Sequence, residues 1–180
     1  MKEEQQSNKS LYLGTFPPRE CGIATFTQDL TIAMDLKFNP QTRSEITAIN
    51  DDPATIYNYS QKVSNQITAN DIENYVSLAE KINGRDDVKV INIQHEFGIF
   101  GGIWGDYLIP FLQVIKKPVV VTFHSVLPGP DDYLKSVVKI ITNKSAVVVV
   151  MNEFSRDLLV KAYGVQRSKI QLIPHGIPGT

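Results

Sequence analysis

Short apolar runs rich in valine and isoleucine alternate along this chain with longer segments of helical periodicity. The first pattern is typical of buried parallel strands and the second of amphipathic helices. We predict strands over residues 10–14, 45–50, 88–94, 118–123, 146–151 and 170–173. We predict helices over residues 24–37, 71–82, 104–116, 131–143 and 153–163. This alternation predicts an α/β fold, a Rossmann-like, doubly wound, mostly parallel sheet with helices on both faces.

Local signals bound several of these elements. Asp71 suits the N-cap of the second helix and Gly84 its C-terminal end. Gly164 suits the end of the last helix in the same way. Residues 51–69 are polar and rich in tyrosine and asparagine, so we predict a short hairpin or an extended excursion there.

Composition narrows the function classes. The chain has 180 residues with 42% hydrophobic and 21% charged residues, which indicates one compact globular domain. A net charge of −1 gives no basic surface for nucleic acid, so that partner is rejected. The single Cys21 excludes an intramolecular disulfide and fits a cytoplasmic protein. No apolar run is long enough to span a bilayer, and membrane contact is expected to be at most peripheral.

Each of the histidines directly follows a predicted strand. They are His95, His124 and His175. Because the carboxyl ends of parallel strands meet at one edge, where open α/β folds bind ligands, the three imidazoles form a candidate site. A zinc centre with three histidine ligands is one alternative, although the order of the strands is not determined by the sequence.

The loop between the first strand and helix runs from Gly14 to Ala24 and contains two prolines. Gly22 stands at the helix entrance, where free backbone N–H groups and a partial positive charge favour a phosphate or diphosphate. The loop matches neither the Rossmann glycine pattern nor the P-loop. A rigid turn that only caps the helix is the alternative.

The loop from His95 to Gly105 combines glycines with three aromatic residues, Phe97, Phe100 and Trp104. These rings suit a platform for a sugar, but they also suit a cover over the end of the sheet, with His95 in a structural role. His124 follows the most strand-like run. An imidazole at that position suits hydrogen bonding to substrate hydroxyls.

Several segments together resemble the N-terminal half of family 4 (group 1) retaining glycosyltransferases, which have the GT-B fold of two Rossmann-like domains across a cleft. The segments that carry the resemblance are Tyr12–Pro18, Gly22–Phe26, Gln94–Gly98, Val121–His124 and Tyr163–Ile177.

The resemblance implies a flexible N-terminus over residues 1–9, an acceptor-binding domain over 10–174, and over 175–180 the start of a hinge to a donor-binding domain that this chain lacks. It implies a hexosyltransferase of polysaccharide biosynthesis. Such an enzyme transfers mannose or glucose from a nucleotide diphosphate sugar to a saccharide or lipid-linked acceptor, without a metal or other cofactor. The chain alone is then expected to be inactive.

Site residues follow from the matched motifs. The resemblance implies a catalytic role for His124. It implies contacts to the donor phosphate from Cys21, Gly22 and Ile23, and contacts to the acceptor from His95, Glu96, Gly101 and Gly102. The chain departs from the family pattern at two places: Cys21 replaces a common glycine, and Ile177-Pro178 replaces a common Val-Asp. The alternatives are half of a GT-B sugar epimerase or phosphorylase, and a non-catalytic α/β ligand-binding domain.

Overall fold

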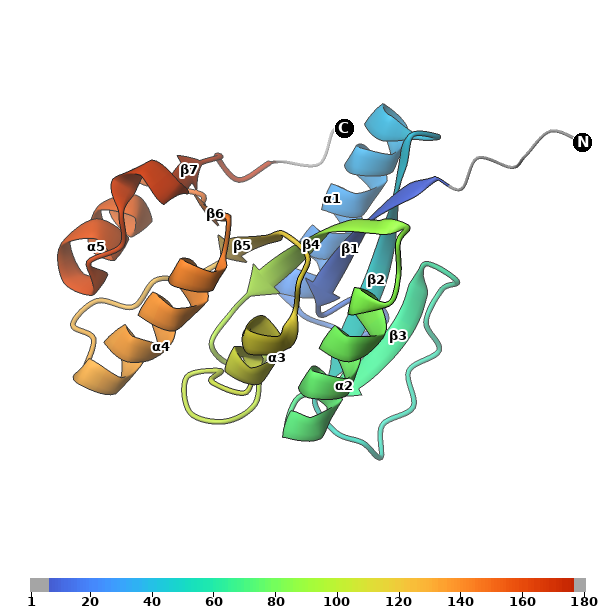
Figure 1. Cartoon of the computed structure of the whole chain (residues 1–180), viewed down its shortest axis with the longest axis horizontal. Coiled ribbons are helices and arrows are strands. Elements are labelled where there is room, and N and C mark those ends of the chain that lie inside the picture. Colours follow the sequence, from blue (N-terminus) through green and yellow to red (C-terminus); the bar gives the residue numbers. More distant parts are fainter. Residues whose placement is uncertain (1–6, 177–180) are drawn as a thin grey trace, which may run out of the picture.

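The strands of the described residues form one seven-stranded sheet in the order β3-β2-β1-β4-β5-β6-β7, and every neighbouring pair is parallel. The structure, a computed structural model, describes residues 7–176 (Figure 1). The strands are β1 (Asn8–Gly14), β2 (Thr42–Asn50), β3 (Val63–Thr68), β4 (Val88–His95), β5 (Val119–Phe123), β6 (Val147–Val150) and β7 (Ile170–Leu172). This arrangement confirms the predicted Rossmann-like, doubly wound fold.

The helices lie on both faces of the sheet, but unequally. They are α1 (Gly22–Phe38), α2 (Ile72–Asn83), α3 (Leu108–Val114), α4 (Asp132–Lys144) and α5 (Glu153–Tyr163). Successive helices from α2 to α5 contact one another, and α1 lies on the opposite face (Figure 1). Right-handed crossovers require this division, because the chain reverses its direction across the sheet after β3.

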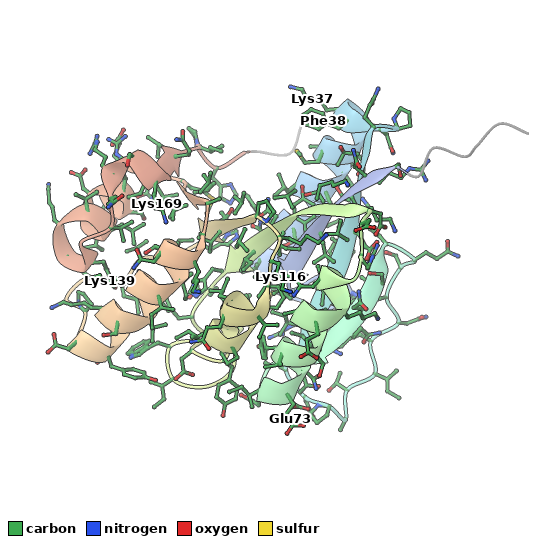
Figure 2. The ribbon with its side chains drawn as sticks, viewed as in Figure 1. Lys37, Phe38, Glu73, Lys116, Lys139 and Lys169 are labelled. Atoms are coloured by element: carbon green, nitrogen blue, oxygen red, sulfur yellow. The ribbon has the colours of Figure 1, made fainter. Side chains whose placement is uncertain are left out.

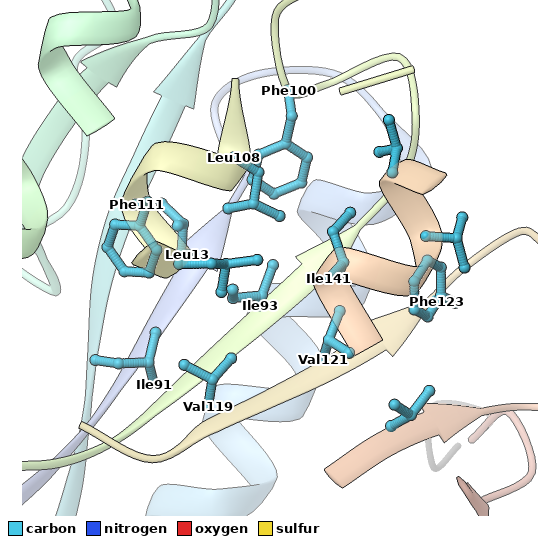
Figure 3. Packing of buried hydrophobic residues seen from close by; sticks show 14 of the residues in the cluster. Leu13, Ile91, Ile93, Phe100, Leu108, Phe111, Val119, Val121, Phe123 and Ile141 are labelled. Carbon is cyan, nitrogen blue, oxygen red and sulfur yellow. The ribbon is translucent and has the colours of Figure 1, made fainter. Parts of the chain in front are cut away.

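Side-chain alternation along the strands builds a separate core on each face. Leu11 and Leu13 belong to the larger core under α2–α5. Figure 3 shows Leu13 there together with Ile91 and Ile93. Tyr12, between the two leucines, points to the smaller core under α1. Burial on both faces explains why the strands read as continuous apolar runs.

The prediction for residues 51–69 was wrong in its last third. Residues Val63–Thr68 form β3, which pairs in parallel with β2 at the edge of the sheet, and no hairpin forms. Only Ile67 of this strand is buried, so its sequence carries almost no apolar signal. Hydrogen bonding to β2 determines the strand.

The helix predicted over 104–116 is also shorter than expected, because α3 spans only Leu108–Val114. Gly102, Trp104 and Gly105 have positive φ angles of 81°, 58° and 77°. A left-handed backbone cannot continue a right-handed helix, so these residues form turns that precede α3.

The predicted caps are confirmed at three positions. Asp71 accepts a hydrogen bond from the Glu73 N–H at the start of α2, and Gly84 caps its end. Gly164 ends α5 with a left-handed φ of 68°. Within the described part of the chain, no helix is both long and apolar enough to cross a membrane.

The two ends of the molecule carry different helix termini. Figure 2 places Glu73, where α2 begins, opposite Lys37 and Phe38, where α1 ends. Helices begin beside the carboxyl edge of the sheet, so that edge collects the loops with the candidate site residues. The predicted flexible terminus lies outside the described residues over 1–6, and β1 begins at Asn8. Of the predicted hinge, only His175 and Gly176 are described.

Candidate functional site

The start of α1 and the ends of β5 and β7 meet at the carboxyl edge of the sheet. The ring of Phe26 lies 4.8 Å from the ring of His124, measured between centroids, in an edge-on arrangement. The same phenyl ring lies 5.1 Å from the ring of His175. Phe26, which follows the predicted donor loop in the first turns of α1, is therefore brought next to the predicted catalytic histidine, although more than ninety residues of sequence separate the two.

Cys21 and the residues after it form an open helix N-terminus. The Cys21 Sγ accepts a hydrogen bond from the Ala24 N–H at 3.4 Å and lies 3.1 Å from the Thr15 hydroxyl. Among residues 7–176, the backbone N–H groups of Gly22 and Ile23 have no acceptor. A Cβ added to Gly22 would meet no atom within 4 Å. The cysteine thus serves as the cap, and two N–H groups stay free for an anion.

His124 is held by its backbone and its ring. Its N–H donates to the His95 carbonyl at 2.9 Å, and its Nε2 lies 2.9 Å from Gln94 Oε1. Burial, and next the neighbouring His175, lowers the pKa of His124 to about 4. The imidazole is therefore neutral at physiological pH.

His95 lies in the core beneath the site. Its ring is fully buried, stacked on Phe100 at 5.4 Å and in contact with Phe97 and Phe123. Burial, and next the neighbouring His124, lowers its pKa to about 3. Neither ring nitrogen has a hydrogen-bond partner among the described residues. This enclosure fits the structural alternative for His95, and the contact of His95 with the acceptor stays a prediction.

Glu96, by contrast, is only half-buried at this edge. One of its carboxylate oxygens accepts a hydrogen bond from the Phe97 N–H at 3.0 Å, and the other accepts from the Ser125 hydroxyl at 2.7 Å. Glu96 therefore joins the loop after β4 to the loop after β5 through Ser125, the residue that follows His124 in the sequence.

Gly101 and Gly102 have local structural reasons to be glycine. A Cβ on Gly101 would overlap the Ala69 carbonyl, whose oxygen accepts a hydrogen bond from the Gly101 N–H. A Cβ on Gly102 would overlap the Asp106 carboxylate, and the residue has a φ of 81°. Close packing of the loop requires both glycines, without any contribution from a ligand.

Three residues of this region were missed by the sequence analysis: Asn92, Gln94 and Phe26. Asn92 and Gln94 are joined by a hydrogen bond of 2.7 Å, and Gln94 is fully buried. The sequence signal that could have found Asn92 and Gln94 is that both lie on the same face at the end of an otherwise apolar strand. A polar side chain on a buried face needs a hydrogen-bond partner, which points to a polar contact there. Phe26 gave no signal, because a helical phenylalanine normally packs in the core.

The zinc alternative has no support in the structure. Among residues 7–176, no group of three histidine, cysteine or carboxylate side chains is arranged to hold a metal ion. The ring of His95 is enclosed by aromatic rings, and the Nε2 of His124 is engaged with Gln94.

Comparison with known proteins identifies the family. Residues 70–178 match the family described as Glycosyltransferase Family 4. No curated protein matches the chain. The matched segment covers more than half of the sequence and contains α2 to β7 with all three histidines, whereas the loop at Gly22 precedes it. Together with the Rossmann-like sheet, this match shows that the chain is an N-terminal domain of glycosyltransferase family 4.

Proposed function

We propose that this chain is the acceptor-binding domain of a retaining hexosyltransferase. The enzyme transfers mannose or glucose from a nucleotide diphosphate sugar to a saccharide or lipid-linked acceptor. Family membership supports glycosyl transfer in general. The assignment of the substrates rests on one observation. The N-terminus of α1 has free N–H groups, and Phe26 of the same helix contacts the neutral ring of His124.

The start of α1 suits the departing diphosphate. When the sugar–oxygen bond breaks, negative charge develops on the phosphate, and preorganised donors lower the free energy of that state. The free N–H groups of Gly22 and Ile23 and the helix dipole supply such donors. Because no atom lies within 4 Å of the position of a Gly22 Cβ, a phosphate oxygen has room to approach this backbone.

His124 suits the transferred sugar. Glycosyl transfer develops positive charge on the sugar ring, and a charged imidazolium beside it would oppose that charge. Burial keeps the pKa of His124 near 4, so the ring stays neutral and one of its nitrogens can accept a hydrogen bond from a sugar hydroxyl. We assign His124 to the reacting sugar and His175, which is exposed, to the turn after β7.

The loop after β4 suits the acceptor. The loop carries the carboxylate of Glu96, a group that commonly binds sugar hydroxyls. It also carries the partly exposed indole of Trp104, a group that commonly packs on sugar faces. Trp104 is 36% exposed and stands edge-on to Phe97 at 6.2 Å. We propose that the acceptor lies across this loop.

The proposal includes a second domain that binds the nucleotide from the opposite side of a cleft. It requires no metal ion, because the helix N-terminus and the second domain share the diphosphate charge. The reaction is proposed to take place in the cytoplasm, with at most peripheral contact with a membrane.

Product analysis tests this function. The complete gene product is incubated with UDP-glucose or GDP-mannose and a panel of saccharide acceptors, and nucleotide release and the anomeric configuration of the product are followed. We expect transfer with retention from one of these donors, and no transfer by residues 1–180 alone. Turnover by this chain alone would show that a second domain is unnecessary. An inverted product, or release of nucleotide without transfer, would contradict the proposal.

A further inference from the structure

A chain of polar side chains crosses the end of the sheet beneath the candidate site. Asn92 and Gln94 lie on β4, and His124 follows β5. The Gln94 Nε2 donates to the Asn92 Oδ1 at 2.7 Å, and the Gln94 Oε1 lies 2.9 Å from the His124 Nε2. The family match and the predicted site residues assign no role to Gln94.

Gln94 has little freedom to move. Its side chain is fully buried, and a Cβ on Gly14 of β1 would lie 3.0 Å from the Gln94 Cβ. β1 and β5 flank β4 on its two sides. A buried primary amide in such a position is costly unless both of its ends are hydrogen bonded, and here both are.

The direction of these hydrogen bonds determines which ring nitrogen of His124 carries the proton. An amide oxygen only accepts hydrogen bonds, so the nitrogen that faces Gln94 Oε1 must carry a proton. A neutral imidazole has one such proton. The Nε2 of His124 is therefore the donor and the Nδ1 is unprotonated.

The Nδ1 of His124 is open to a ligand. It has no hydrogen-bond partner among the described residues. Unlike both ring nitrogens of His95, it is not fully enclosed by protein atoms. An unprotonated ring nitrogen accepts a hydrogen bond and has no proton to donate.

We propose that Gln94 is a positioning residue that holds His124 as the Nε2–H tautomer, so that Nδ1 accepts a hydrogen bond from a hydroxyl of the bound sugar. The assignment of the tautomer stands on the geometry alone. The identity of the bound group rests on the proposed function.

Imidazole nitrogen chemical shifts test the tautomer in the 180-residue chain. Long-range proton–nitrogen spectra at neutral pH, assigned with the single variants His95→Asn, His124→Asn and His175→Asn, report which nitrogen of His124 is protonated. We expect a protonated Nε2 and an unprotonated Nδ1. The opposite pattern would show that both amides are reversed and would overturn the proposal.

Two variants separate positioning from packing. Gln94→Met keeps the length of the side chain but accepts no such bond, so we expect the His124 signals to move toward an average of both tautomers. Gln94→Glu keeps an acceptor opposite Nε2, so we expect the Nε2 proton to be retained. Gln171→Met, at an exposed position of β7, is the control and should change nothing. Unchanged His124 signals in Gln94→Met would overturn the role of Gln94, and the wild-type spectrum decides the tautomer even if a variant fails to fold.

Turnover by the complete gene product tests the second half of the proposal. We expect Gln94→Met to lower kcat/KM about tenfold, the equivalent of one lost hydrogen bond. A normal rate in a variant with averaged tautomers would overturn the contact with the sugar. Absence of any transfer by the wild-type protein, together with the expected nitrogen shifts, would reject the proposed function and retain Gln94 as the residue that positions His124.

Discussion

Phe26 and His124 lie edge to face, with ring centroids 4.8 Å apart and an interplanar angle of 86°. This contact joins the first turns of α1 to the end of β5, and thereby joins the proposed phosphate site to the proposed sugar site. It also covers part of the imidazole, whose burial keeps it neutral.

Replacement of the imidazole tests its place at the reacting sugar. We expect His124→Ala to lower kcat by 10²-fold or more, as is typical for a group that contacts the transition state. The free energy of unfolding should fall by about 1–3 kcal/mol, because the loss of the imidazole leaves the buried Gln94 Oε1 without its hydrogen-bond partner. His175→Ala removes the other imidazole next to Phe26 and should reduce the rate less than tenfold. Equal losses in both variants would argue against a special role for His124.

A side chain at Gly22 tests the phosphate site. Gly22→Val places its Cβ in open space, so we expect a melting temperature close to that of the wild type. Donor-dependent turnover should fall by 10²-fold or more, because the methyl groups occupy the approach to the free N–H groups. Saccharide binding, followed by the fluorescence of the only tryptophan, Trp104, should survive.

Gly84→Val is the matched control for this variant, because Gly84 lies at the end of α2, on the opposite edge of the sheet. We expect normal turnover from it. A Gly22→Val protein with normal turnover would place the diphosphate elsewhere. A protein that unfolds would show that Gly22 only completes the turn.

The left-handed backbone at Trp104 predicts that a glycine variant is more stable than an alanine variant, the reverse of the usual order in a helix. Among the described residues, Trp104 is the only non-glycine residue with a positive φ. Trp104→Gly and Trp104→Ala both lose the contact with Phe97, but only alanine retains the steric cost of this backbone. We expect the glycine variant to be about 1 kcal/mol more stable, measured by urea unfolding with circular dichroism. Lys139, exposed in the middle of α4, should show the usual order, with alanine more stable than glycine. The same order at both positions would contradict the strained loop.

An ion cluster at the opposite edge of the sheet predicts sensitivity to acid. Burial alone would raise the pKa of Glu45, but hydrogen bonds from Arg85, Lys9 and Ser64 outweigh it and lower the pKa to about 2. A hydrogen bond from Arg85 also lowers the pKa of Asp87 to about 2. Both folded-state pKa values lie below the ordinary values of 4.5 and 3.8. The cluster therefore stabilises the fold fully above about pH 5, and this stabilisation is lost as the pH falls toward 2.

Urea unfolding between pH 7 and pH 3 measures this loss. We expect Glu45→Gln to lower the free energy of unfolding at pH 7 by about 2 kcal/mol and to make it less dependent on pH than in the wild type. Glu80→Gln, at an exposed position of α2, should leave both quantities unchanged. A Glu45→Gln protein that keeps the wild-type pH dependence would show that this cluster does not cause the acid sensitivity.

Elements with a strong local signal were predicted well. The helix predicted over 153–163 matches the bounds of α5, because its N-cap at Asn152 and its end at Gly164 are encoded by those residues themselves. The strands β5 and β6 were predicted to within a residue at each end, because valine runs buried on both faces have few alternatives. Where a segment and its neighbours prefer the same conformation, the sequence alone determines the structure.

The remaining features depend on residues far apart in the chain. β3 exists because β2 offers hydrogen bonds to a polar edge segment, and α3 begins late because the packing of Gly101 on Ala69 folds the preceding loop into turns.

The histidines show the same division. The sequence alone placed all three at one edge, because parallel strands bring their carboxyl ends together. Only the tertiary structure buried His95 among phenylalanines and placed one nitrogen of His124 against Gln94, with no partner for the other nitrogen among residues 7–176. Burial and hydrogen-bond partners come from neighbouring strands and loops, so no pattern along a single strand contains them.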